Sequence, residues 1–363
     1  MLSLIIALMA LVGAVAAIIY QFQVAGPLRE RLDEQEAMIA RLTGIDNARV
    51  TNTLDPRYSD ADADLVADVP KDAAKLLDPP VLKFSYVATD STSFKKPFAE
   101  LTAALSQATG KPVEYVDYDS TDDQLRALHD GQLQITALNT GAVPIGVCAA
   151  GFVPLAQMSD DSGTGGYNME IIVPAGSPLQ KLQDLRDHEL AVTEPTSNSG
   201  YKAPLVALRE IGLRPPRDYR LRYSYGHINS IAGIKSKTFD AAAVAGDVLK
   251  REVAAGHIAV TDFRSIYRSE QTFPTATLGY VYNLKPELAA KVRQVILNFK
   301  WQGTGLEKEF GSEGKSKFIG VDYRKDWEFV RRNDESIGYS YQLKTVGTIA
   351  LESPATQPAA AAP

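Results

Sequence analysis

From residue 81 onward, segments with strand and helix patterns follow one another in regular alternation. Three short apolar runs typical of strands are separated by two helical segments, which close at Gly110 and Gly131. In chain order the segments read VLKFSYVA, FKKPFAELTAALSQATG, PVEYVDY, STDDQLRALHDG and LQITAL. A βαβαβ order is typical of a mainly parallel sheet covered by helices. The pattern therefore predicts an α/β fold.

The alternation then starts again, and this repetition predicts a second lobe. YNMEIIVPAG, ELAVTE, YRLRYSYG and FDAAAVAG are further strand patterns, and a last strand and a long amphipathic helix follow them. We place the bilobal domain at residues 81–345, with lobe 1 at about 81–168 and 276–345 and lobe 2 at about 169–275. The loop DSGTGGYN lies between the two units, where either a hinge or a plain surface loop would fit.

The first residues have a different character. Residues 2–20 carry no charge and are long enough to cross a hydrocarbon core of about 30 Å. No basic residue precedes them and the run exceeds a usual signal-peptide core, so a membrane anchor is favoured over a cleaved signal for residues 1–22. Arg29 and Arg31 follow the segment, which by the positive-inside rule alone would leave the body in the cytoplasm.

Three segments that flank the bilobal domain have recognisable sequence patterns. Residues 23–45 carry an apolar stripe among charges and predict a stalk helix, which would lie on the body or pair with another copy in an oligomer. Residues 46–80 predict a linker, and residues 346–363 predict a disordered tail.

Charge and cysteine content exclude several classes of protein. The net charge is -6 and the basic residues are scattered, so nucleic acid is not an expected partner. Cys148 is the single cysteine, which excludes an internal disulfide and a cysteine-based zinc cluster. The four histidines have no metal-ligand spacing. We expect no metal site and no cofactor.

Small polar side chains gather in the turn EPTSNSGYKAP, residues 194–204. Thr196, Ser197, Asn198 and Ser199 come directly after a predicted strand and before a predicted helix. Ligands of α/β lobes bind at such strand ends, and hydroxyl, amide and first-turn N–H groups favour an anion there. The alternative is that these residues serve only as a helix cap, although a cap needs one of them. The turn therefore predicts an oxyanion site without a counter-charge.

Other motifs are weaker or misleading. His227 would either donate a hydrogen bond to a bound oxygen or serve only in packing. Asp247 would either accept a proton from a protonated oxyanion or serve only as the cap of a turn. GSEGKSK has the wrong glycine spacing for a phosphate-binding P-loop, and the usual hydrolase motifs are missing. We therefore do not expect an enzyme.

Taken in order, three stretches resemble a known family. YNMEIIVPAGSPLQKLQDLRDHELAVTEPTSNSGYKAP, YGHINSIAGIKSKTFDAAAV and FPTATLGYVYNLKPELAAKV are similar to the periplasmic substrate-binding proteins of phosphate, phosphite and phosphonate ABC transporters, the phosphonate-binding family. The resemblance spans about residues 81–335. It implies a two-lobed type II periplasmic-binding fold that closes on a phosphorus oxyanion.

The resemblance also implies site residues. The family's anion loop falls on residues 197–200, and its second loop in the same lobe falls on Gly226, His227 and Asn229. In lobe 1, position alone points to Thr89 and Ser91 in the first strand-to-helix loop, or to Asn139 in the third, as residues that face the ligand. In many members, two tyrosines line the ligand. This sequence has Thr121 at the first of these positions and Val143 at or near the second, and Tyr118 or Tyr86 is a candidate substitute.

These observations lead to one hypothesis and two alternatives. The first is a membrane-anchored extracytoplasmic binding protein for a small phosphorus oxyanion, which serves an ABC permease or a sensor kinase. The second is a receptor-like scaffold or sensor accessory protein with a degenerate cleft or a cleft for another oxyanion. An enzyme on the same fold is disfavoured because no nucleophile and base are evident.

Overall fold

The computed structural model describes residues 52–88 and 93–343. The expected anchor or signal (1–22), stalk helix (23–45) and tail (346–363) lie outside the described residues, as do Thr89 and Ser91. Within the described ranges, no helix combines the length and the apolar character needed to cross a membrane.

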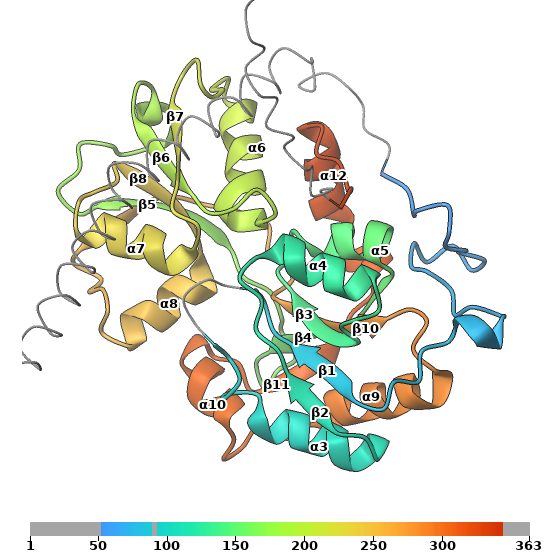
Figure 1. Ribbon diagram of the computed structural model, residues 1–363. Helices are drawn as coiled ribbons and strands as arrows, with labels where there is room; N and C mark the ends of the chain where they lie inside the picture. The colour runs from blue at the N-terminus through green and yellow to red at the C-terminus, as the bar shows by residue number, and fades with distance from the viewer. Residues whose placement is uncertain (1–51, 89–92, 344–363) are drawn as a thin grey trace, which may run out of the picture.

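Two α/β lobes, each with its own sheet, form the body (Figure 1). The sheet of lobe 1 has six strands in the order β11-β4-β10-β3-β1-β2, and that of lobe 2 has five in the order β7-β6-β8-β5-β9. The strands of lobe 1 are β1 (Leu82–Ser85), β2 (Val113–Tyr115), β3 (Ile135–Leu138), β4 (Phe152–Ser159), β10 (Thr277–Val281) and β11 (Lys317–Gly320). Those of lobe 2 are β5 (Met169–Pro174), β6 (Glu189–Val192), β7 (Arg220–Tyr223), β8 (Ala241–Ala245) and β9 (Phe263–Arg268).

Both sheets are mixed, so the prediction of a mainly parallel sheet is wrong. Strands β1, β2 and β3 pair in parallel as the βαβαβ order requires. Strand β10 returns from lobe 2 in the opposite direction and inserts between β3 and β4 as an antiparallel neighbour. The local sequence of β10 does not reveal this reversal, because the reversal depends on where the chain re-enters lobe 1.

Local signals account for the helix ends. Helix α3 (Ala99–Thr109) stops at Gly110, whose φ of 72° is readily adopted by glycine. Helix α4 (Thr121–His129) begins at Ser120, whose hydroxyl accepts the N–H of Asp123. The remaining helices of lobe 1 are α5 (Val143–Ala150), α9 (Pro286–Asn298), α10 (Gly305–Phe310), α11 (Tyr323–Asp326) and α12 (Glu328–Ser336). Lobe 2 contains α6 (Ala203–Glu210), α7 (His227–Lys235) and α8 (Gly246–Ala254).

Short helical turns complete the described elements. They are η2 (Ala73–Lys75), η3 (Leu182–Leu185), η4 (Asn198–Lys202) and η5 (Gly311–Glu313), of which η4 is π-helical and the others are 3-10 turns. Turn η4 continues directly into α6, and η5 follows α10.

The chain crosses between the lobes twice, in the segments 160–168 and 269–276. The crossings run side by side, because Tyr167 and Phe273 each donate a backbone N–H to the carbonyl of the other, at 2.9 and 2.8 Å. The loop DSGTGGYN is thus part of the first crossing. Paired crossing strands of this kind are suited to act as a hinge.

Residues 52–80, the described part of the expected linker, lie along lobe 1. The backbone N–H of Asp55 donates to Cys148, and Leu77 exchanges backbone hydrogen bonds with Asn283 and Lys285. Asn52 donates its side-chain amide to the carbonyl of Tyr339. Cys148 itself is buried.

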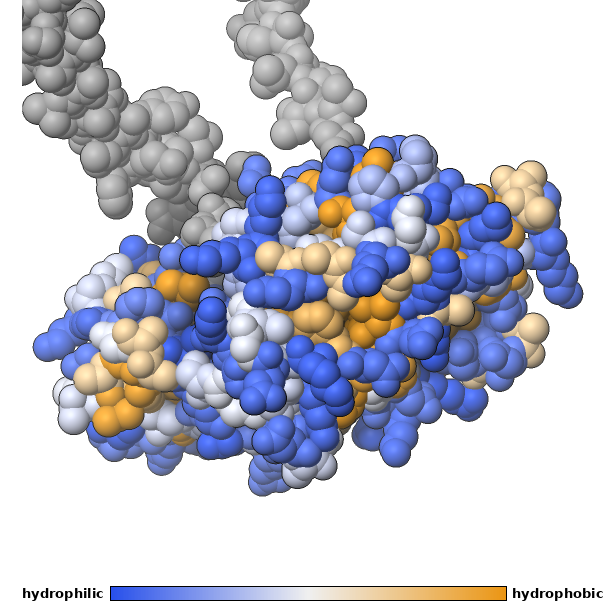
Figure 2. All heavy atoms as spheres, turned by 90° about the horizontal axis from the view of Figure 1, so that it is seen from below, coloured by the Kyte–Doolittle hydropathy of each residue, from blue (hydrophilic) through white to orange (hydrophobic). Residues whose placement is uncertain are grey.

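The apolar core continues through both lobes, and a second, smaller cluster lies in lobe 2. The smaller cluster joins Ile231 and Ile234 of α7 to Ala242 and Val244 of β8. In Figure 2, which views the molecule from below, hydrophobic side chains form separate patches among hydrophilic ones.

Candidate functional site

A cavity of about 480 Å³ lies between the lobes. Its wall brings together seven of the residues that the sequence predicted as ligand-binding: Asn139, Ser197, Asn198, Ser199, His227, Asn229 and Asp247. Thr196 is buried but does not line this cavity. The volume falls within the range of small-molecule sites.

The anion loop lies in the segment 194–200, which follows β6 and runs into turn η4. Ser197 is the N-cap of η4, and its hydroxyl accepts the backbone N–H of Gly200 at 3.1 Å. The capping alternative therefore explains Ser197. It does not explain Asn198 or Ser199, which are both 1% exposed and both lie on the cavity wall.

Asn198 is the most informative residue of the loop. Within the described residues, neither its amide nitrogen nor its amide oxygen makes a hydrogen bond of acceptable geometry, although the side chain lies close to the hydroxyl of Tyr167. An unsatisfied buried amide costs free energy, so the group is poised for a partner that enters the cavity. The amide nitrogen is a neutral donor, as the sequence pattern predicted for an oxyanion site.

Glu194 ties the anion loop to lobe 1. Its Oε1 accepts the hydroxyl of Thr121 at 2.7 Å and the amide nitrogen of Asn139 at 3.3 Å. Asn139 also accepts the backbone N–H of Ala142. Thr121, at a position where the resemblance led us to expect a tyrosine, thus contributes to a contact between the lobes. Asn139 lines the cavity with its side chain already engaged.

His227, at the start of α7, presents a neutral imidazole. Burial, followed by the charge of Arg251, lowers its pKa to about 4. Its Nδ1 accepts the backbone N–H of Ala245 at 3.3 Å, so the proton of the neutral ring is on Nε2. His227 therefore offers a second neutral donor. Asn229 in the same turn donates its amide to the carbonyl of Ser224 at 2.9 Å.

The lowered pKa of His227 predicts a pH-dependent loss of stability. The imidazole is neutral in the fold but charges readily when unfolded, so the unfolded state binds more protons below about pH 6.5. Relative to His227→Asn, the wild-type free energy of unfolding should fall by about 2 to 3 kcal/mol between pH 6.5 and 4. Urea denaturation at stepped pH measures the difference. Parallel profiles for the two proteins would contradict it.

Four charged residues form a cluster at the cavity. Arg251 of α8 pairs with Glu313 of η5 and so joins lobe 2 to lobe 1. Burial, then repulsion by Asp247, raises the pKa of Glu313 to about 7, and burial also raises the pKa of Asp247. Lys315 donates to the carbonyl of Gly166 at 3.2 Å. Sequence reasoning missed Arg251 and Glu313, because 62 residues separate the partners.

Two tyrosines line the cavity. They lie at other positions than the two ligand-lining tyrosines that the resemblance led us to expect. Tyr86 follows β1, and Tyr167 lies in the first crossing. The hydroxyl of Tyr167 donates to Thr140 at 3.1 Å. Tyr86 was one expected substitute, whereas Tyr118 does not line the cavity. Tyr167 was missed, although it stands in the hinge motif that the sequence singled out.

A buried ion pair lies behind the anion loop. Lys202, in turn η4, is fully buried, and its Nζ lies 2.8 Å from Asp334 of α12. The same nitrogen donates to the carbonyl of Gly141 in lobe 1 at 2.9 Å. The hydroxyl of Tyr341 donates to Asp334 at 2.8 Å. These contacts hold the anion loop of lobe 2 against the C-terminal part of the body.

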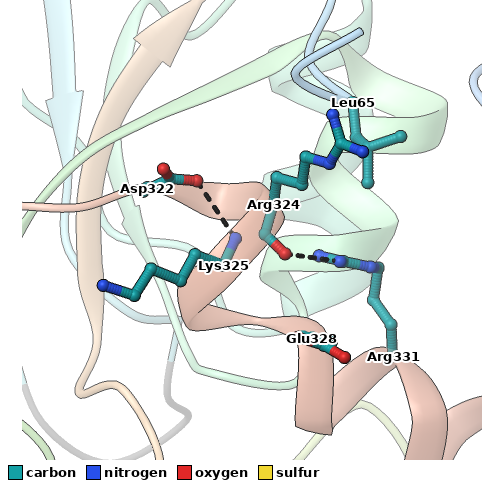
Figure 3. A pocket seen from close by; sticks show the side chains of 6 residues that line it. All are labelled: Leu65, Asp322, Arg324, Lys325, Glu328 and Arg331. Carbon is teal, nitrogen blue, oxygen red and sulfur yellow. Dashed lines mark hydrogen bonds between the residues drawn. The ribbon is translucent and has the colours of Figure 1, made fainter.

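A second hollow, of about 520 Å³, lies on the surface of lobe 1 (Figure 3). Arg324 donates to the carbonyl of Ala63, and Arg331 donates to the carbonyls of Tyr323 and Arg324. The guanidinium groups thus hold the chain's own backbone. The hollow contains none of the residues predicted as ligand-binding; its lining is Leu65, Asp322, Arg324, Lys325, Glu328 and Arg331.

Solved structures share this architecture. The binding protein component of a phosphonate ABC transporter from Pseudomonas aeruginosa is 20% identical, with a TM-score of 0.61, over 71% of this chain and 86% of that one. PhnD1 from Prochlorococcus marinus, solved with methylphosphonate, is 15% identical with a TM-score of 0.62, over 71% and 98% of the two chains. XAC2383 from Xanthomonas citri, solved with ATP, is 19% identical with a TM-score of 0.57, over 72% and 97%.

No curated protein matches the sequence. The model of one family does, over residues 84–327, and it describes the periplasmic substrate-binding protein of phosphonate ABC transporters. The members of this family bind their substrates and carry out no reaction on them. The match covers more than half of the chain and includes the anion loop, the crossings and the charged cluster. The chain therefore belongs to the phosphonate-binding family of periplasmic ABC-transporter substrate-binding proteins.

Proposed function

We propose that this member of the family is a membrane-anchored, extracytoplasmic receptor for a small phosphorus oxyanion: phosphate, phosphite or a phosphonate. It delivers the ligand to an ABC permease or reports it to a sensor kinase. The lobes close over the anion, and the closed form is what the partner protein recognises. The uncharged segment at residues 2–20 supports anchoring.

The unpartnered amide of Asn198 carries the proposal. It is 1% exposed and lines the interlobe cavity, and among the described residues neither of its polar atoms has a hydrogen-bond partner of acceptable geometry. His227, whose neutral ring carries its proton on Nε2, lines the same cavity and supports the proposal. Neutral donors of this kind replace the hydration of an anion and still allow its release, which suits transport.

The test is calorimetric titration of the full chain in detergent with phosphate, methylphosphonate, phosphite, sulfate and arsenite. One phosphorus oxyanion should bind tightly and selectively. Asn198→Ala should weaken that binding about 10- to 100-fold, because hydrogen bonds to a charged group are lost. The same substitution should leave the unfolding temperature unchanged or raised, since it removes an unsatisfied buried amide.

Asn298→Ala is the matched control, because this exposed residue at the end of α9 does not line the cavity. It should bind like the wild type. In cells, the full chain should stay with the membrane fraction after an alkaline wash, and a chain without residues 2–20 should not. The absence of heat with every anion would favour the scaffold alternative instead.

A further inference from the structure

The cavity is larger than a phosphorus oxyanion requires, although the lobes already touch. Thr121 bonds Glu194 across the lobes, and Arg251 pairs with Glu313 across them. About 480 Å³ nevertheless stays open between these contacts. At about 30 Å³ per water molecule, this is the space of roughly 16 waters. A tetrahedral oxyanion with five heavy atoms fills only a small part of it.

Part of the remaining space is bounded by three aromatic rings of lobe 1, Tyr86, Phe94 and Phe310, which we call the aromatic wall. The ring centres of Tyr86 and Phe94 are 4.8 Å apart, and that of Phe310 lies 5.8 Å from Tyr86 and 6.0 Å from Phe94. All three rings line the cavity. Ile228 and Val248 of lobe 2 line it as well. Apolar walls on both lobes favour an apolar part of a ligand.

The charged groups near the aromatic wall are engaged with one another. Arg251 pairs with Glu313, and Lys315 is close enough to lower the pKa of both Glu313 and Asp247. Arg251 also lies 4.0 Å from Glu309. Asp247 also accepts the backbone N–H of Val248 at 2.9 Å. Among the described residues, the carboxylates beside the wall already face cations, so an ammonium group on the ligand would compete with an existing ion pair.

We propose that the aromatic wall receives an uncharged, apolar substituent carried by the phosphorus atom. The ligand is then an alkyl- or arylphosphonate, rather than inorganic phosphate, phosphite or an aminoalkylphosphonate. The inference rests on the proposed function, because it concerns the part of the ligand that the anion loop does not hold.

The test is titration of the full chain with inorganic phosphate, methylphosphonate, n-propylphosphonate, 2-aminoethylphosphonate and phenylphosphonate. The propyl and phenyl compounds should bind at least 10-fold more tightly than methylphosphonate, because they bury more apolar surface. The aminoethyl compound has an ammonium where the propyl compound has a methyl group. It should bind at least 10-fold more weakly than the propyl compound.

Phe94→Ala tests the wall itself. It should reduce the preference for phenylphosphonate over methylphosphonate at least fivefold, while Phe94→Leu, which keeps an apolar side chain, should retain part of it. A purely structural defect would weaken both ligands equally and leave the ratio unchanged, which would contradict the role of the wall.

The outcomes separate this inference from the proposed function. If methylphosphonate and phosphate bind but the larger neutral phosphonates bind no better, the substituent pocket is refuted and the oxyanion receptor stands. Preference for the aminoethyl compound would equally refute an uncharged substituent. If no phosphorus compound binds, the oxyanion receptor itself is refuted, and this inference with it.

Discussion

Asp334→Ala is expected to lower the free energy of unfolding by about 3 to 5 kcal/mol, because it leaves a buried ammonium without its counter-ion. Lys202 and Asp334 both have fully buried side chains, and their charged atoms lie 2.8 Å apart. After the substitution, the described partners left to Lys202 are the carbonyl of Gly141 and the rings of Tyr339 and Tyr341, whose centres lie 4.3 and 5.9 Å away. Thermal unfolding should show a decrease of roughly 10 °C.

Two further variants make this result specific. Adding Lys202→Met to Asp334→Ala removes the orphaned charge and should recover at least half of the lost stability, because an apolar pair avoids the desolvation of two ions. Asp123→Ala breaks an exposed ion pair with Arg126 and should cost less than about 1 kcal/mol. If the double variant were no more stable than Asp334→Ala alone, the explanation by an orphaned charge would be wrong.

The sequence was sufficient to predict features that depend only on residues close together in the chain. The helix end at Gly110 and the cap at Ser120 follow local rules, and the structure has both. The start of α6 at Ala203 agrees with the constraint that Pro204 imposes. The place of the anion loop after β6 follows from the general position of ligand sites in α/β lobes.

Features that depend on contacts between distant parts of the chain could not be predicted from the sequence. The antiparallel insertion of β10 joins residues more than 100 positions apart, and Lys202 meets Asp334 across 132 positions. From the sequence alone, a lysine after an anion loop would be expected at the surface, and none of its neighbours in the chain indicates that it is buried. The same holds for Arg251 and Glu313, whose meeting requires both lobes to be in place. Tertiary contacts, rather than propensity, decide such cases.

The anion loop packs closely against lobe 1 at Gly141, and this contact leads to the prediction with the largest effect on binding. A Cβ atom there would lie 2.2 Å from the carbonyl oxygen of Thr196 and 2.7 Å from the backbone nitrogen of Asn198. Both are backbone atoms that have little freedom to move aside. Gly141→Ala should therefore force the anion loop away from lobe 1 and weaken the binding of methylphosphonate about 100-fold or more.

Gly176→Ala is the matched control, since no atom lies within 4 Å of the added methyl group. It should keep wild-type affinity, so that only the position of the glycine differs between the two variants. X-ray scattering without ligand adds a second readout, which is independent of the ligand's identity: the radius of gyration of Gly141→Ala should exceed that of the wild type and of Gly176→Ala. Wild-type affinity and an unchanged radius in Gly141→Ala would mean that the lobes do not need this contact. Closure over the anion would then depend on the Glu194 and Arg251 contacts instead.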